Sequence, residues 1–188
     1  SILNNPRSEF NVIVGGLLDY TEYDIFFLLF HPITTDPVGD VNKQTKRTGD
    51  GTPPVMESGY PKVNSQSING ATVVIKLDES GKCFYVVVDY QSGTSHYPST
   101  LQIFAGQNKQ GETALLSGSV DIGSGNTEIS HTVSGSRRII KDKTSYSIVV
   151  ACEDTRGDPA NQQTFTSGTS FTTEEDTTPP AFVPNDPV

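Results

Sequence analysis

The stretch YSIVVACE, residues 146–153, decides the fold. It is rich in apolar and β-branched side chains and has no helical period, so it predicts a β-strand. Six further stretches are predicted as strands: ATVVIKLDE (71–79), KCFYVVVDY (82–90), LQIFAG (101–106), LLSGSVDI (115–122), EISHTVSG (128–135) and TFTSGTSFTT (164–173). Turn residues separate them, and about seven short strands with frequent turns are typical of an antiparallel β-sandwich.

Composition narrows the class of protein. The chain has 188 residues, a net charge of −9 and only 34% hydrophobic residues, which suits small all-β modules. The negative charge argues against nucleic acid as a partner. The longest apolar run, residues 25–30, is far shorter than the roughly 20 residues that a membrane helix needs, so no membrane insertion is expected.

The chain also repeats itself. DGTPPVMES (50–58) matches DTTPPAFVP (176–184), and TEYDIFF (21–27) matches TSYSIVV (144–150). The two matches occur in the same order at nearly the same offset, which indicates a tandem array of modules.

The Thr-Pro-Pro elements are the natural module boundaries, because two prolines keep the backbone extended and semi-rigid. They predict one complete module at 51–176, the C-terminal strands of a preceding module at 1–50, and a linker with the first strand of a following module at 177–188. The chain is either a window on a longer chain, or its ends are completed by neighbouring copies.

A family resemblance appears on these residues. Tyr146-x-Ile148-x-Val150, followed by ACEDTRGDPANQQTFTSGTSFTT and DTTPP, resembles fibronectin type III and bacterial Ig-like modules. GYPKV, LDESGKCFYVVV and YPSTLQIFAGQ resemble one subgroup of such repeats. The resemblance covers 51–176, and 10–50 as the last strands of a sister module. It implies tandem modules of a secreted or cell-surface protein, whose relatives include structural spacers, adhesins and accessory modules of enzymes.

The resemblance implies that one face of the strand at 146–153 lies in the core. The inward residues would be Tyr146, Ile148, Val150 and Cys152, and the strand period of two agrees. The Tyr146 hydroxyl would lie at a corner and bond nearby backbone. In the first module the inward residues would be Tyr23, Ile25, Phe27 and Leu29.

The opposite face of the same strands provides the first candidate site. Its residues are Val149, Ala151 and Glu153 in the second module, and Phe26, Leu28 and Phe30 in the first. Burying a large apolar side chain is worth roughly 1.5–3 kcal/mol, so something should cover the three in the first module. Either a loop of the same module covers them, such as HPITTDPVGD (31–40), or they form an interface with another module or chain.

The two cysteines are the second candidate. The resemblance places Cys83 and Cys152 on the third and sixth strands of the module, which are usually neighbours in one sheet. A disulfide is therefore expected, with two buried thiols as the alternative.

Arg156-Gly157-Asp158 is the third candidate, since this tripeptide is a known adhesion signal. As an adhesion loop it would present a cation and a carboxylate to a receptor of the integrin type. A polar turn is the favoured interpretation, because turns select Gly and Asp in any case.

Catalytic, cofactor-binding and metal residues are not expected. The three histidines have no metal-site spacing, no nucleophile or phosphate-loop motif occurs, and pairs such as Glu153-Asp154 are expected to be solvated strand ends. The sequence therefore predicts a non-catalytic structural protomer of an extracellular array or filament. The alternatives are an adhesin that binds a cell surface or carbohydrate, and a spacer module of a secreted enzyme. Expected partners are copies of itself or neighbouring modules, and O-linked glycans are compatible with the many Ser and Thr.

Overall fold

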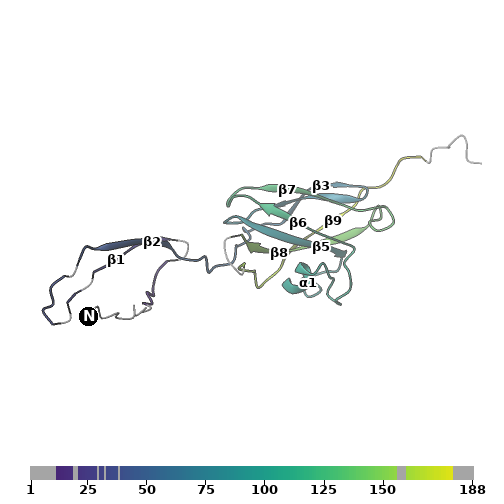
Figure 1. Ribbon diagram of the computed structural model, residues 1–188. Helices are drawn as coiled ribbons and strands as arrows, with labels where there is room; N and C mark the ends of the chain where they lie inside the picture. The colour runs from purple at the N-terminus through teal and green to yellow at the C-terminus, as the bar shows by residue number, and fades with distance from the viewer. Residues whose placement is uncertain are drawn as a thin grey trace, which may run out of the picture. The chain divides into compact units, whose positions relative to one another are not determined.

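The computed structural model describes residues 12–18, 21–28, 30–31, 33–37, 39–155 and 160–179. The chain divides into two compact units, Ser1–Thr52 and Pro53–Val188, which are described separately here (Figure 1). The division falls inside the first Thr-Pro-Pro element.

The first unit contains one antiparallel strand pair. β1 (Glu22–Phe27) pairs with β2 (Asn42–Arg47), with Glu22 opposite Arg47 and Phe27 opposite Asn42. Tyr23 and Ile25 of β1 are partly buried and its other residues are exposed, whereas every residue of β2 is exposed. That this pair belongs to a preceding module stays a prediction.

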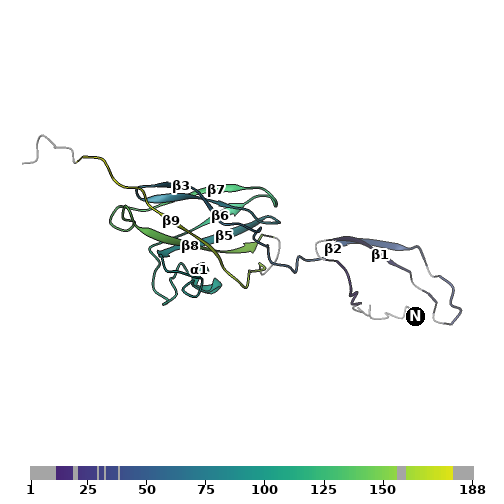
Figure 2. The ribbon, with the colours of Figure 1, turned by 180° about the vertical axis from the view of Figure 1, so that it is seen from behind.

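The second unit consists of two antiparallel sheets (Figures 1 and 2). One has the strand order β3 (Lys62–Ser67), β4 (Gly70–Ile75), β7 (Ile129–Ser134); the other has the order β6 (Leu116–Ile122), β5 (Gly81–Asp89), β8 (Ser145–Asp154), β9 (Ser167–Thr172). The all-β class and the antiparallel pairing predicted from the sequence are confirmed.

One hydrophobic core joins the two sheets. Its buried side chains come from β4 and β7 on one side and from β5, β6, β8 and β9 on the other: Ala71, Val73, Ile75, Val133, Cys83, Val87, Ile122, Tyr146, Ile148, Val150, Cys152 and Phe171. The four residues expected to face inward on the strand at 146–153 are all among them. The alternation of side chains along β8 therefore places one face of this strand in the core, as predicted.

Two elements differ from the sequence prediction. The stretch 101–106 was expected to be a strand, but it contains a short helix, α1 (Thr100–Phe104). Ser99 caps this helix: its side chain accepts from the backbone N–H of Gln102, and the Gln102 side chain accepts from the backbone N–H of Ser99. Conversely, β3 is a strand that the sequence does not predict, because KVNSQS has too few apolar residues to show a clear alternation.

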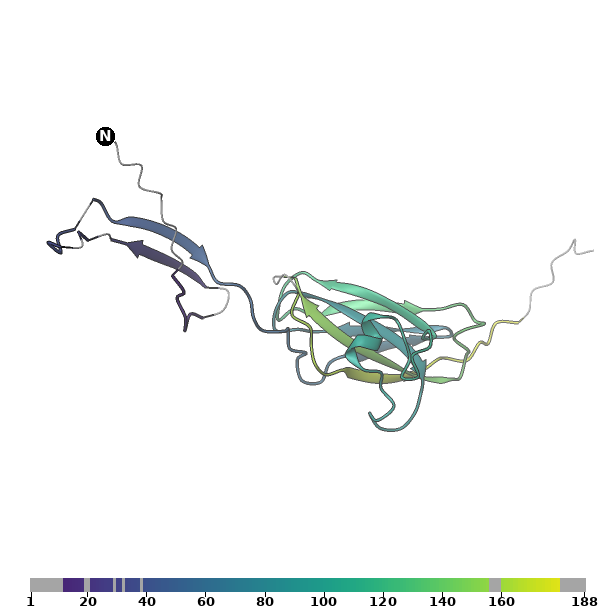
Figure 3. The same ribbon diagram turned by 60° about the horizontal axis from the view of Figure 1, so that its bottom comes forward.

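The helix lies on the outer face of the four-stranded sheet. It is part of the connection between β5 and β6, and Figure 3 brings it in front of the sheet. Ile103 of the helix and Ala114 of the same connection pack with Val86 of β5 and with Val149 and Ala151 of β8 in a second buried cluster. Val149 and Ala151 thus face away from the main core, as predicted, but they are fully buried by this connection.

Cys83 and Cys152 are joined by a disulfide between the neighbouring strands β5 and β8. Both residues are completely buried in the main core. A disulfide between these two residues, rather than two buried thiols, is what the sequence predicts.

Candidate interaction surface

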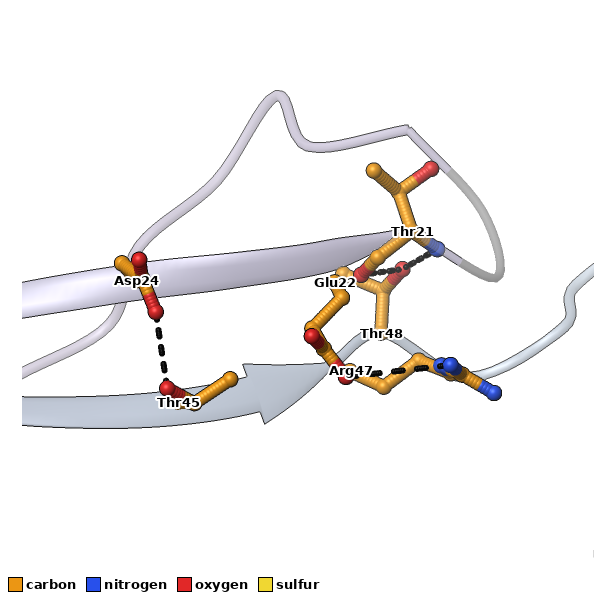
Figure 4. A network of polar contacts seen from close by, with 6 residues as sticks. All are labelled: Thr21, Glu22, Asp24, Thr45, Arg47 and Thr48. Carbon is orange, nitrogen blue, oxygen red and sulfur yellow. Dashed lines mark hydrogen bonds and ion pairs between the residues drawn. The ribbon is translucent and has the colours of Figure 1, made fainter.

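The start of β1 is held by hydrogen bonds around Thr21 and Thr48 (Figure 4). The Thr48 backbone N–H donates to the Thr21 carbonyl at 3.0 Å, and the Thr21 N–H donates to Thr48 Oγ1 at 2.9 Å. Thr48 Oγ1 in turn donates to the Leu18 carbonyl at 2.6 Å, and the Leu18 N–H donates to the Tyr23 hydroxyl at 2.9 Å. The Tyr23 hydroxyl therefore holds the backbone at Leu18, just ahead of β1.

The same hydrogen bonds occur at the start of β8 in the second unit. The Thr173 N–H donates to the Thr144 carbonyl at 3.0 Å, and the Thr144 N–H donates to Thr173 Oγ1 at 3.0 Å. Thr173 Oγ1 donates to the Lys141 carbonyl at 2.6 Å, and the Lys141 N–H donates to the Tyr146 hydroxyl at 2.9 Å. The predicted corner bond of Tyr146 is thereby confirmed, and Tyr23 makes its counterpart.

This agreement aligns β1 with β8 residue by residue. In both units the tyrosine hydroxyl accepts from the residue five positions earlier, so Leu18 corresponds to Lys141 and Tyr23 to Tyr146. Continuing along the strands, Phe26 corresponds to Val149 and Leu28 to Ala151. The two strands thus present equivalent faces.

The equivalent faces of β8 and β1 differ in solvent exposure. Val149 and Ala151 are fully buried beneath the connection that carries α1. Phe26 is 62% exposed, Leu28 39% and Phe30 58%. We call these three residues the apolar stripe. Exposed large apolar side chains on one strand and its extension make this face a candidate contact surface.

An ion pair between Asp24 and Lys43 lies beside the stripe. Lys43 Nζ lies 2.8 Å from Asp24 Oδ2, and Thr45 Oγ1 donates to Asp24 Oδ1 at 2.7 Å. The hydrogen bond from Lys43, followed by that from Thr45, holds the pKa of Asp24 below its ordinary value. Lys43 Nζ also lies 6.0 Å from the centroid of the Phe26 ring, so this cation contacts both the carboxylate and the start of the stripe.

The segment 31–40 does not cover the stripe with the residues that the structure describes. The His31 N–H donates to the Asp36 carbonyl at 2.8 Å, which closes a local turn, and Phe30 forms an isolated bridge with Pro37. Ile33, the large apolar residue of this turn, is itself strongly exposed. The described residues of this segment thus leave the stripe exposed.

The predicted inward face of the first unit is only partly buried. Tyr23 and Ile25 are half-buried, but Phe27 is exposed, so the expectation that it lines a core is not met within the described residues. Leu29 lies outside the described residues. The hairpin by itself offers too few apolar partners to close a core over Phe27.

Arg156, Gly157 and Asp158 lie outside the described residues. Asp154, just before them, is buried, which contradicts its expected role as a solvated strand end. Its carboxylate accepts from the Asn161 N–H at 3.1 Å and from Asn161 Nδ2 at 2.7 Å, so it ties β8 to the segment that leads into β9. The pattern of a carboxylate followed by a loop of Gly, Asp and Pro gave no sign of this burial.

Neither a scan against protein-family models nor a search of curated proteins found a match for this chain. Among the residues that the structure describes, no three His, Cys, Asp or Glu side chains gather where they could hold a metal ion. No described helix is long and apolar enough to cross a membrane.

Proposed function

We propose that this chain is a non-catalytic structural protomer of an extracellular tandem-repeat array or filament, in which the apolar stripe is a module-to-module contact surface. The main support for this proposal is the hydrogen-bonded corner that recurs around Tyr23 and Tyr146. A hairpin with the same corner, the same strand order and an uncovered apolar face is what one end of a sister module would look like.

The second unit supports a β-sandwich module of the fibronectin type III or Ig-like kind. Its two antiparallel sheets share one core. In the larger sheet β5 and β8, which are the third and sixth strands of this unit, lie side by side. A tyrosine at the start of the sixth strand whose hydroxyl bonds to preceding backbone is a known feature of such modules.

The Thr-Pro-Pro elements support a repeated joint between modules. The Thr52 N–H donates to Asp50 Oδ1 at 3.3 Å, and the Thr178 N–H donates to Asp176 Oδ1 at 3.0 Å. In each case an aspartate fixes the backbone immediately before the prolines. In the second unit the buried Gln163 continues this anchoring, because its Nε2 donates to the Pro54 carbonyl at 2.7 Å.

The disulfide supports a location outside the cytosol. Structural disulfides persist in oxidising compartments and are rare where thiols are kept reduced. The Cys83–Cys152 bond is buried between two central strands, which is a structural position rather than a redox-active one.

The experiment is sedimentation velocity of the full chain over a wide concentration range, with electron microscopy of the most concentrated samples. We expect concentration-dependent assemblies that are lost in the double variant Phe26→Ser, Leu28→Ser. Ile33→Ser is the matched control, because it removes an exposed apolar side chain of the same unit outside the stripe. A chain that stays monomeric at all concentrations would contradict the proposal.

A further inference from the structure

We propose that one segment of a preceding sister module binds at the apolar stripe and at the edge of β1 that has no strand partner among the described residues. This segment is a strand equivalent to β5, followed by a short helix equivalent to α1. This inference rests on the proposed array, and it specifies what covers the stripe. The occupant is identified by the correspondence between β1 and β8, whose surroundings are known.

The strand half of the proposal follows from sheet pairing. β8 pairs with β9 on one edge and with β5 on the other. Within the described residues β1 pairs with β2 alone, and β2 occupies the place of β9 because Thr48 corresponds to Thr173. The remaining edge of β1 therefore corresponds to the edge of β8 that binds β5, and an antiparallel strand fits it.

The two strands of the hairpin differ in composition, and only β2 carries basic residues. β2 has the sequence NKQTKR, and its basic residues are of the type that discourages pairing at a sheet edge. β1 has the sequence EYDIFF and carries neither lysine nor proline. The hairpin thus discourages additional pairing at β2 and permits it at β1.

The helix is inferred from the residues that cover Val149 and Ala151, the counterparts of Phe26 and Leu28. Val149 and Ala151 are sealed by Ile103 and Ala114 from the connection between β5 and β6. A strand that pairs with β1 in the manner of β5 would direct the same kind of connection over Phe26 and Leu28. Because these two side chains are larger than valine and alanine, the covering helix must carry smaller side chains than Ile103 or lie farther from the sheet.

The test supplies the proposed segment from this chain's own residues. A copy of residues 53–140 is placed directly ahead of residues 18–188, so that Leu18 follows the copy as Lys141 follows residue 140. Phe27 corresponds to Val150, which lies opposite Tyr85 in the pairing of β5 with β8. Tyr85→Cys together with Cys83→Ala in the added copy, combined with Phe27→Cys, places two thiols at one cross-strand position, as Cys83 and Cys152 are placed in the natural pair.

We expect the two introduced thiols to form an intramolecular disulfide, seen by mass spectrometry of peptides cut without reduction. The matched control carries Phe26→Cys in place of Phe27→Cys, and its thiol should stay unlinked because Phe26 faces the opposite side of β1. Hydrogen exchange gives a second readout that needs no cysteine: the β1 amides should become protected by at least tenfold in the fusion without thiols, relative to the full chain.

Two results would overturn the inference. They are equal linking by both introduced thiols, and β1 amides that stay unprotected in the fusion. The outcome is separate from that of sedimentation: a monomeric full chain with a linked fusion would reject the filament and keep the strand-and-helix contact.

Discussion

At the scale of single residues, one tyrosine hydroxyl organises each corner. Tyr146 is buried, and its hydroxyl satisfies the Lys141 N–H at the place where the chain turns into β8. Tyr23 does the same for Leu18 ahead of β1. A hydroxyl in this position replaces the backbone acceptor that a sheet would otherwise supply.

Replacing Tyr146 by phenylalanine should therefore destabilise the second unit by about 1–3 kcal/mol, the usual cost of leaving a buried donor without an acceptor. Urea unfolding measures the change. Tyr90→Phe is the control, because Tyr90 is an exposed tyrosine of the same unit, and its loss of a hydroxyl should leave the free energy of unfolding nearly unchanged. Equal effects of the two substitutions would argue against the corner bond.

The lowered pKa of Asp24 predicts that the stability of the hairpin depends on pH. Its pKa is lowered, first by the hydrogen bond from Lys43 and then by that from Thr45. A lowered pKa means that the hairpin is favoured by the ionised carboxylate at neutral pH, and that this contribution is lost as the pH falls through the lowered pKa. NMR titration of the carboxyl carbon should show the shift, and Lys43→Gln should move the pKa back toward its ordinary value. Lys46→Gln, opposite Tyr23 on the other face, should leave it where it is.

At the scale of elements, α1 shows what the sequence could and could not predict. The strands β5 and β8 were predictable because Val, Ile, Tyr and Phe dominate them. The stretch at 101–106 was misassigned because LQIF is apolar and too short to show a helical period. The Ser99 and Gln102 spacing of a capping box was the available signal. Burial of Val149 and Ala151 could not be predicted without that helix, since it depends on packing between elements.

Two aliphatic residues of α1 distinguish the contribution of buried packing to stability from that of helix formation. Ile103 is 1% exposed in the cluster with Val86 and Val149, whereas Leu101 is 71% exposed. Ile103→Ala should cost about 2–5 kcal/mol of unfolding free energy. Leu101→Ala should change it by no more than about 0.5 kcal/mol. Denaturant unfolding of both variants checks the difference, and similar losses would mean that the helix does not seal the sheet through Ile103.

At the scale of the whole molecule, charge limits association. The chain carries a net charge of −9 at pH 7, and its isoelectric point is about 4.7. Like-charged copies repel one another, and salt screens this repulsion. Association through the apolar stripe, as proposed, would therefore have to overcome a general repulsion between copies.

Static light scattering should consequently show stronger self-association as the pH is lowered from 7 toward the isoelectric point, and as salt is added at pH 7. The stripe variant Phe26→Ser, Leu28→Ser should respond less to both changes. If association weakened toward the isoelectric point, attraction between opposite charges rather than the apolar stripe would be holding the copies together.

The disulfide has a mechanical consequence for a chain that is pulled by its ends. Cys83 and Cys152 are 69 residues apart, and their bond carries the force past everything between them. Strands β6 and β7 and helix α1 lie in that bypassed loop, so tension cannot unravel them. Reduction should release about 240 Å of additional extension per chain, at roughly 3.5 Å per residue, in single-molecule stretching. The bond thus sets how far the second unit can lengthen under load.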